Sequence, residues 1–259
     1  MSQVPDYIEK GSSGEVVLFL HGVGGSARSW VPQIERFSTK YRAVAWNMPG
    51  YGESIPFENM SFPFLADSLL ALLDDRDWEK VHLVGHSMGG MVAQEFAVAQ
   101  QNRLHSLTLS ATSPAFGRRD ADFQKSFVEK RLAPLTAGIT MSDLATELIG
   151  KMMSADADAS GRRLAHDCMA NVPVEVYRAA IECIITFEQR TNLPNIRVPT
   201  LAIAGETDTT AAATIMEKMA AKIPGCRYVC LPKVGHLSYL EDPLAFNSVL
   251  SDFLLTVSN

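Results

Sequence analysis

One serine stands in a turn whose neighbours suit a nucleophile. Residues 85–90 read Gly-His-Ser-Met-Gly-Gly, directly after an apolar run at residues 81–84 and directly before a helical pattern. A sharp strand-to-helix turn exposes its central side chain, and it needs small residues two positions to either side, here Gly85 and Gly89. The turn also places Ser87 at a helix N-terminus, where free amides favour negative charge. We therefore predict that Ser87 is a nucleophile, the alternative being a glycine-rich turn with an incidental serine.

A serine hydroxyl is a weak nucleophile until a neighbouring base takes its proton, so a histidine must lie nearby. His236 is the best placed of the six histidines, because its loop follows the last predicted strand and precedes the last predicted helix. That loop lies at the same edge of the predicted sheet as Ser87. His21 and His86 lie in turns of the chain and are expected to shape the backbone. The others, His82, His105 and His166, are expected to be surface or packing residues.

The base needs an acidic partner that fixes its tautomer and stabilises the imidazolium. Asp208 is the leading candidate, because it follows a predicted strand and gives the chain order serine, aspartate, histidine. Glu206 is the alternative, but its side chain would start closer to the strand end. Asp242 lies near the base in sequence, yet Pro243 follows it, so we expect it to cap the last helix.

Attack on a carbonyl group produces an oxyanion, which preorganised donors must stabilise. We predict two backbone amides, that of Met88 after the nucleophile and that of Val23 in the glycine-rich loop at residues 21–25. Because the donors are main-chain groups, the side chains of Met88 and Val23 are free to line a pocket. A phosphate-binding loop is the alternative, but the chain lacks the Lys-Ser/Thr pair and the GxGxxG spacing of nucleotide sites.

Short apolar runs that alternate with helical patterns must position these residues. We predict strands at residues 15–21, 42–47, 81–85, 106–110, 200–205 and 227–231. We predict helices at residues 30–38, 62–74, 89–101, 211–222 and 243–256. This alternation indicates an α/β fold, a doubly wound and mostly parallel sheet.

One stretch breaks the alternation. Residues 113–195 show helical periodicity and methionines but no convincing buried strand. We predict a core domain of residues 1–112 and 196–259 and a helical cap inserted at residues 113–195, over the strand ends where open α/β sheets bind ligands. The alternative is a separate helical domain docked at the side.

Composition narrows the function classes. The net charge of −6 argues against nucleic acid as a partner, because phosphates need a basic surface. The four cysteines lack metal-site spacing and are expected to be buried free thiols, so we predict no metal. We find neither a signal-peptide pattern nor an apolar run of membrane-spanning length, and we expect a cytoplasmic protein without a membrane partner.

The motifs together resemble the α/β-hydrolase superfamily over most of the chain. They are LFLHGVGG, WNMPGYGES, GHSMGG, VPTLAIAGETD and VGHLSYLEDP. The C-terminal part looks most like 3-oxoadipate enol-lactonases and related hydrolases of aromatic ring-cleavage products. The resemblance implies hydrolysis of a small, often carboxylated ester, lactone or vinylogous ketone in aromatic or small-acid catabolism, with no metal or organic cofactor.

The chain also departs from these relatives. Ring-cleavage C–C hydrolases usually carry an aromatic residue after the catalytic histidine, whereas this chain has Leu237, which disfavours that activity. Haloalkane dehalogenases need an aspartate in the elbow, so Ser87 excludes them. The N-terminal part has little room for the hairpin that normally precedes the HG strand, and we expect one edge strand to be missing or irregular.

A carboxylated substrate calls for a cation in the pocket. The candidates are Arg28 beside the oxyanion loop and Arg118, Arg119 and Arg131 in the predicted cap. Solvated arginines are the alternative. Met141, Met152, Met153 and Met169 could line an adaptable apolar pocket, although their helical spacing favours packing within the cap. We name Arg28 and Met153 as candidate substrate contacts.

Three functions remain in view. The favoured one is esterase or lactonase chemistry through an acyl-enzyme on Ser87. The second is C–C or amide hydrolysis, or cofactor-free oxygen chemistry, on the same residues. The third is a non-catalytic receptor that kept the pocket. In each case the partner is a small molecule.

Overall fold

A seven-stranded sheet forms the centre of the protein in a computed structural model, which describes residues 4–54, 59–117 and 121–257. The strands are β1 (Tyr7–Lys10), β2 (Val16–Leu20), β3 (Arg42–Trp46), β4 (Val81–His86), β5 (Leu104–Ser110), β6 (Thr200–Gly205) and β7 (Arg227–Leu231). They lie in the order β1-β3-β2-β4-β5-β6-β7, and only β1 runs antiparallel to its neighbour. The predicted α/β fold with a mostly parallel sheet is confirmed.

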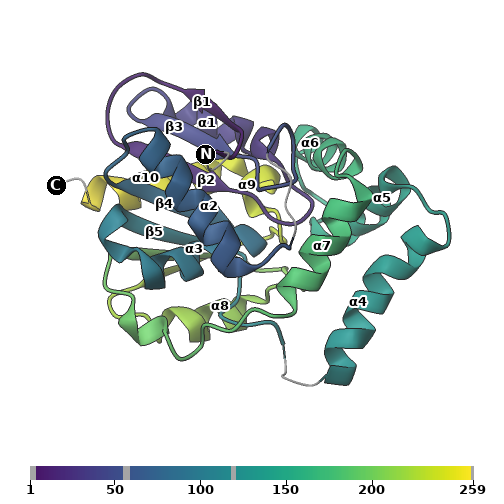
Figure 1. The fold of residues 1–259 in the computed structure, drawn as a ribbon. Helices are drawn as coiled ribbons and strands as arrows, with labels where there is room; N and C mark the ends of the chain where they lie inside the picture. Colours follow the sequence, from purple (N-terminus) through teal and green to yellow (C-terminus); the bar gives the residue numbers. More distant parts are fainter. Residues whose placement is uncertain (1–3, 55–58, 118–120, 258–259) are drawn as a thin grey trace.

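Helices cover both faces of this sheet (Figure 1). Those of the sheet region are α1 (Val31–Phe37), α2 (Phe62–Asp75), α3 (Met88–Ala99), α8 (Ala213–Ala220), α9 (Ser238–Glu241) and α10 (Pro243–Val257). The short 3-10 helices are η1 (Ala27–Trp30), η2 (Gln101–Arg103) and η3 (Leu193–Asn195). Helices α2 and α3 pack against each other, and so do α1 and α10. Six predicted strands and five predicted helices are present, with ends shifted by at most two residues.

The region between β5 and β6 holds four α-helices among the described residues: α4 (Ala121–Thr136), α5 (Met141–Met152), α6 (Ala159–Ala170) and α7 (Val174–Ile184). They gather at one side of the sheet, with α4 at the outer edge (Figure 1). No strand is assigned between residues 121 and 195, apart from an isolated bridge of Glu188 to Ala115.

At the N-terminal edge the described residues form one strand and not the two of a hairpin, in line with our expectation that one edge strand is missing. Within residues 4–15 the structure has β1 alone, and it pairs with β3 from Tyr7 opposite Trp46 to Lys10 opposite Ala43. This pairing has an unbroken register. A single short strand therefore forms this edge of the sheet, because a hairpin would need more residues than the segment before β2 provides.

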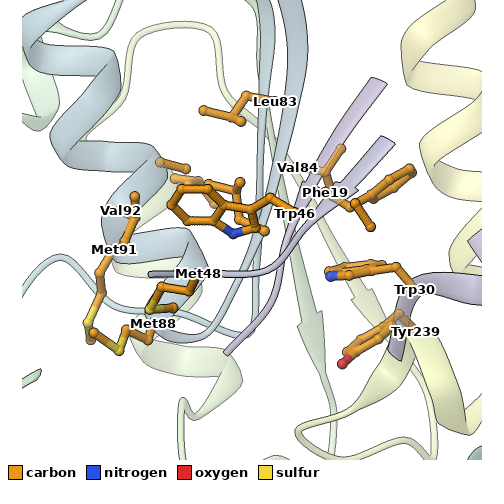
Figure 2. Packing of buried hydrophobic residues seen from close by; sticks show 14 of the residues in the cluster. Phe19, Trp30, Trp46, Met48, Leu83, Val84, Met88, Met91, Val92 and Tyr239 are labelled. Atoms are coloured by element: carbon orange, nitrogen blue, oxygen red, sulfur yellow. The ribbon is translucent and has the colours of Figure 1, made fainter. Parts of the chain in front are cut away.

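The core packs Phe19, Trp30 and Tyr239 on one side of the strands, and Trp46 with Met48, Met88 and Met91 on the other (Figure 2). Trp30 stacks on Tyr239 at 4.1 Å between ring centroids, and Phe19 lies 5.0 Å from Trp30. Met88 is fully buried beside Met48 and is not among the residues that line the active-site cavity, so its side chain does not take the pocket position that we considered open to it. The reason is that the first turn of α3 faces the sheet.

All four cysteines are free. Cys168 and Cys183 are buried as expected, whereas Cys226 is partly buried and Cys230 is exposed. Cys230 is exposed because β7 is the last strand of the sheet and pairs with a neighbouring strand, β6, on one side only. Among the helices of the described chain, none combines the length and the apolar character needed to cross a membrane.

Candidate active site

Ser87 occupies a strained turn between β4 and α3. Its φ of 51° and ψ of −118° lie in a region that residues with a side chain rarely adopt. Two contacts hold this conformation: the Ser87 amide donates to the Ser110 carbonyl at 3.0 Å, and the Thr112 hydroxyl donates to the Ser87 carbonyl at 2.8 Å. Strain of this kind persists where the surroundings impose it, and it is frequent at functional sites.

The glycines around Ser87 allow three backbone segments to meet. A Cβ atom on Gly85 would lie 2.4 Å from the carbonyl oxygen of Gly89. A Cβ atom on Gly89 would lie 2.4 Å from the carbonyl oxygen of Leu20. These approaches explain the requirement for small residues on which the sequence argument relied.

The structure brings the three predicted residues Ser87, His236 and Asp208 together. His236 lies in the loop between β7 and α9, and its Nε2 atom is 3.1 Å from Ser87 Oγ. Its Nδ1 atom is 2.8 Å from Oδ2 of Asp208, which follows the end of β6. An ionised carboxylate can only accept, so the hydrogen of a neutral ring resides on Nδ1. Nε2 is then free to accept the hydroxyl proton of Ser87.

Asp208 is buried and still favours its charged form. Burial alone would raise the pKa of this carboxyl, but the hydrogen bond and charge of His236 and two backbone amides together lower the pKa below its usual value. Those amides belong to Thr210 and Ala211, and they donate to Oδ1 at 2.7 and 3.0 Å. Oδ1 is thus held by the backbone while Oδ2 faces the imidazole.

The backbone of His236 is held from two sides. Its amide donates to the carbonyl of Met152 at the end of α5, at 2.8 Å. Its carbonyl oxygen lies 2.9 Å from Nε2 of His86. Burial, together with the nearby His236 ring, lowers the pKa of His86 to about 3, so His86 is neutral and donates through Nε2. His86 thus holds the backbone of the His236 loop, 150 positions along the chain, whereas we expected it to shape its own turn.

The rival acids lie elsewhere. Glu206 is exposed and accepts from the Lys233 amide at 2.9 Å. Asp242 accepts from the Ala245 amide at 2.9 Å, so it caps the start of α10 as predicted. Neither carboxylate pairs with His236 in the part of the chain that the structure describes.

The loop of residues 21–25 faces Ser87. A Cβ atom on Gly22 would lie 3.0 Å from Ser87 Cβ. The Gly22 carbonyl lies 2.8 Å from His21 Nδ1 and accepts from the Gly25 amide at 2.9 Å. Since a peptide is planar and trans, the Val23 amide points away from these two donors. The Val23 carbonyl accepts from the Tyr51 hydroxyl at 2.8 Å, so the loop is held on one side.

His21 has a defined tautomer in this loop. Its Nε2 atom accepts from the Met48 amide at 3.0 Å, so its hydrogen is on Nδ1 and points to the Gly22 carbonyl. Burial lowers the pKa of His21 to about 4. The ring is neutral, and it acts as a fixed support of the loop backbone.

Ser87 and His236 open into a cavity of about 470 Å³. Residues from the sheet region that line it include Val23, Met91, Thr112, Leu237 and Tyr239. Residues from α4–α7 that line it include Phe127, Arg131, Leu148, Met152, Met169, Tyr177 and Ile181. Its walls are mainly apolar. Two guanidinium groups and no carboxylate occur among the described residues that line it.

The predicted substrate contacts fare differently. Arg28 is exposed and does not line the cavity, because it lies in η1 with its side chain toward solvent. Met153 is 5% exposed and packs in the core, while its neighbour Met152 lines the cavity. The correction follows from the end of α5, where Met153 leaves the helix with extended backbone angles.

The other described residues that we considered as substrate contacts in the predicted cap lie in and around the cavity. Arg131 and Met169 line it, whereas Met141 does not. Arg118 and Arg119 lie outside the described residues. Sequence reasoning missed Arg190 and Tyr239, which both line the cavity. Nothing in their spacing marks them, although Tyr239 lies three residues after His236.

No group of histidine, cysteine, aspartate and glutamate side chains suited to a metal ion occurs in the described segments. At the cavity the hydroxyl of Ser87, the imidazole of His236 and the carboxylate of Asp208 lie in series. Such a series can transfer an acyl group by nucleophilic attack.

Comparisons with known proteins place the chain among hydrolases of one fold family. The chain is 27% identical over 245 residues to 3-oxoadipate enol-lactonase 1 of Acinetobacter baylyi, covering 93% of this chain and 89% of that protein. It is 26% identical over 256 residues to the pimeloyl-(acyl-carrier protein) methyl ester esterase of Aeromonas hydrophila, covering 95% and 98%.

A solved structure has a similar fold. The malate-bound thermophilic esterase from Thermogutta terrifontis superimposes with a TM-score of 0.88 at 26% identity, covering 98% of this chain and 93% of that chain. The resemblance inferred from the motifs is confirmed, since a family model described as the alpha/beta hydrolase fold matches residues 15–243. The chain thus belongs to the alpha/beta hydrolase fold family.

Proposed function

We propose that this protein is a serine hydrolase that cleaves a small ester or enol-lactone through an acyl-enzyme on Ser87. His236 acts as general base and Asp208 as the acid that orients it. The observation that carries the proposal is the unbroken series from Ser87 Oγ through His236 to Asp208, at 3.1 and 2.8 Å, beside a mainly apolar cavity. The lactonase and esterase names of the relatives support this reaction class.

The reaction proceeds in two halves. His236 Nε2 takes the proton of Ser87 as Oγ attacks the substrate carbonyl, and the carbonyl oxygen becomes an oxyanion. The intermediate collapses, and the alcohol or enol oxygen leaves with the proton from His236. A water molecule then gives a proton to His236 and attacks the carbonyl carbon of the acyl-enzyme. As this second intermediate collapses, the acid is released and His236 returns the proton to Ser87 Oγ. Asp208 stabilises the imidazolium in both halves.

The amides of Val23 and Met88 are the proposed oxyanion donors. Met88 is the first residue of α3, and the first amides of a helix have no partner within the helix. The Val23 amide belongs to a loop whose carbonyls are already held by His21 and Tyr51. Fixed donors of this kind stabilise developing charge without reorganisation.

We propose a small carboxylated substrate, with residues 113–195 acting as a cap over the site. The apolar walls suit a hydrocarbon portion, and the lining carries Arg131 and Arg190 without a carboxylate among its described members. Arg190 pairs with Glu188 at 2.8 Å, whereas Arg131 forms no ion pair with a described carboxylate. Arg131 is thus the cation available to a substrate carboxylate.

The test compares wild type with Ser87→Ala on a short-chain p-nitrophenyl ester series and a small enol-lactone. We expect the acyl-transfer activity to fall by roughly 10⁶-fold, because the triad acts as a unit. Asp242→Asn is the matched control, since Asn also caps helices and we expect its activity to remain. Activity that survives in Ser87→Ala would sink the assignment. No turnover by wild type would favour a receptor, and turnover of esters alone would leave the lactonase assignment without support.

A further inference from the structure

Glu241 is a buried carboxylate that the proposed mechanism does not use. It is the last residue of the short helix α9 and is only 5% exposed. Its Oε2 atom accepts from the amides of Ser154 and Gly235 at 2.7 and 2.9 Å, and its Oε1 atom accepts from the amide of Leu237 at 3.0 Å. One side chain therefore satisfies three backbone donors.

These donors surround the proposed base. Gly235 and Leu237 are the residues on either side of His236, so the carboxylate holds the backbone before and after the imidazole. Ser154 lies two residues beyond α5. The Glu241 carboxylate thus joins the His236 loop to the end of a helix that also lines the cavity.

The loop is packed tightly against this helix end. The His236 amide donates to the Met152 carbonyl at 2.8 Å, and a Cβ atom on Gly235 would lie 2.4 Å from that same oxygen. On its other side, a Cβ atom on Gly205 would lie 2.1 Å from the Gly235 carbonyl. The loop is held between β6 and α5, so a shift of either segment would move His236.

Burying a carboxylate is costly unless hydrogen bonds satisfy it, and hydrogen bonds to charged groups are stronger than neutral ones. Glu241 meets this condition with backbone amides. A glutamine at this position keeps one acceptor oxygen but turns an NH₂ group toward at least one N–H donor. The substitution is nearly isosteric, and it disrupts the network without opening a cavity.

We propose that Glu241 is the positioning residue that keeps His236 in reach of Ser87 and couples the placement of the base to that of α5. This inference rests on the proposed function, since it assigns Glu241 a role only if His236 is the base. Glu241 itself does not touch the reacting atoms.

The experiment compares Glu241→Gln with Glu206→Gln. Glu206 is the matched control, because it is an exposed carboxylate that accepts one amide, that of Lys233, in the same loop. With a p-nitrophenyl ester, and with folded enzyme counted by the burst at Ser87, we expect kcat to fall by about 10- to 100-fold in Glu241→Gln while KM stays within about threefold. Glu206→Gln should retain wild-type kcat.

A second readout separates positioning from folding. The low-field proton resonance of His236 Nδ1–H should broaden or move in Glu241→Gln and stay unchanged in Glu206→Gln. A purely structural role would lower the melting temperature and leave kcat per burst site unchanged. A kcat reduced by less than about fivefold, or reduced equally in the control, overturns the proposal.

Two further measurements keep the test decisive. If Glu241→Gln does not fold, hydrogen exchange of the wild-type amides at Ser154, Gly235 and Leu237 decides: protection supports the inference, and exchange at the rate of exposed loops overturns it. Ser87→Ala is run in parallel. Loss of activity in Ser87→Ala with no effect of Glu241→Gln refutes this inference alone, whereas activity in Ser87→Ala refutes the proposed function.

Discussion

Two arginines reach the cavity, and their surroundings give them different tasks. Arg190 donates to Glu188 at 2.8 Å and also to the Gly117 carbonyl, so its guanidinium group is engaged by other parts of the protein. Arg131 lies with its guanidinium carbon 5.3 Å from the ring centroid of Phe127. Burial raises the pKa of Tyr177, and the nearby Arg131 opposes that rise. Arg131 therefore combines a half-buried position with a charge that an anionic ligand can use.

We expect Arg131→Met to discriminate against carboxylated substrates. Met retains much of the apolar stem, so the main loss is a charge-assisted hydrogen bond. For a carboxylated ester, kcat/KM should fall by about tenfold or more relative to a neutral ester of matched size. The measurement is the ratio of the two kcat/KM values.

Lys130→Met is the control for Arg131→Met. It removes the same charge from the neighbouring exposed position of α4, away from the cavity lining. An unchanged ratio in Arg131→Met, or an equal change in both variants, would show that the carboxylate is bound elsewhere.

The catalytic candidates could be predicted from the sequence, whereas the substrate contacts could not. Ser87, Asp208 and His236 each follow a strand of the parallel sheet, so strand order was enough to bring them to one edge. Arg28 and Met153 were misplaced, because the direction of a side chain near a helix end depends on the local turn. The contact of Glu241 with Ser154 joins residues 87 positions apart, and no local pattern predicts it.

At the scale of elements, parallel strands buried on both faces were the readily predictable part. They appear in the sequence as continuous apolar runs, as in β2 and β6, whose residues are all buried. β1 escaped prediction, because an edge strand of four half-exposed residues carries no such run. The bounds of α4–α7 were not predicted. The helical periodicity of residues 113–195 indicated helices, and α5–α7 are indeed amphipathic, but periodicity alone does not mark where one helix ends and the next begins.

The crowding in the elbow between β4 and α3 can be tested by substituting Gly85, with a glycine of α5 as the contrast. In Gly85→Ala, the new Cβ atom would lie 2.4 Å from the Gly89 carbonyl oxygen and 2.7 Å from Gly90 Cα, so the backbone of α3 leaves it no room. We expect a loss of stability and of activity together, with a free-energy cost of at least about 1 to 3 kcal/mol from overpacking. Urea unfolding and ester hydrolysis measure the two effects.

Gly150→Ala is the contrasting variant. Gly150 lies in α5 and is exposed, and a Cβ atom there would have no neighbour within 4 Å. Because glycine costs helix stability relative to alanine, the free energy of unfolding should rise by about 0.5 to 1 kcal/mol. A Gly85→Ala variant as stable and active as Gly150→Ala would contradict the crowded elbow.

At the scale of the whole molecule, buried neutral histidines make stability depend on pH. Burial lowers the pKa of His21 to about 4 and that of His86 to about 3, from an ordinary value of 6.5. Burial also lowers the pKa of His82. Between these folded-state values and 6.5 the unfolded chain binds protons that the native protein does not, so the free energy of unfolding rises with pH. Acidification from pH 6.5 toward pH 4 should therefore destabilise the fold.

We expect His21→Gln to flatten this dependence. For His21 alone, lowering the pH from 7.5 to about 5 should cost about 2 kcal/mol in the free energy of unfolding, and a glutamine, which does not titrate, removes that contribution. The reduced pKa of Asp208 acts in a different window, because its stabilisation is lost only as pH falls below its usual value of 3.8. Urea unfolding at pH 7.5 and pH 5 gives the difference for wild type, His21→Gln and the partly exposed control His166→Gln. If the free energy of unfolding changes equally between pH 7.5 and pH 5 in all three proteins, His21 is protonated in the native protein at pH 5. A charged ring would then hold the Gly22 carbonyl.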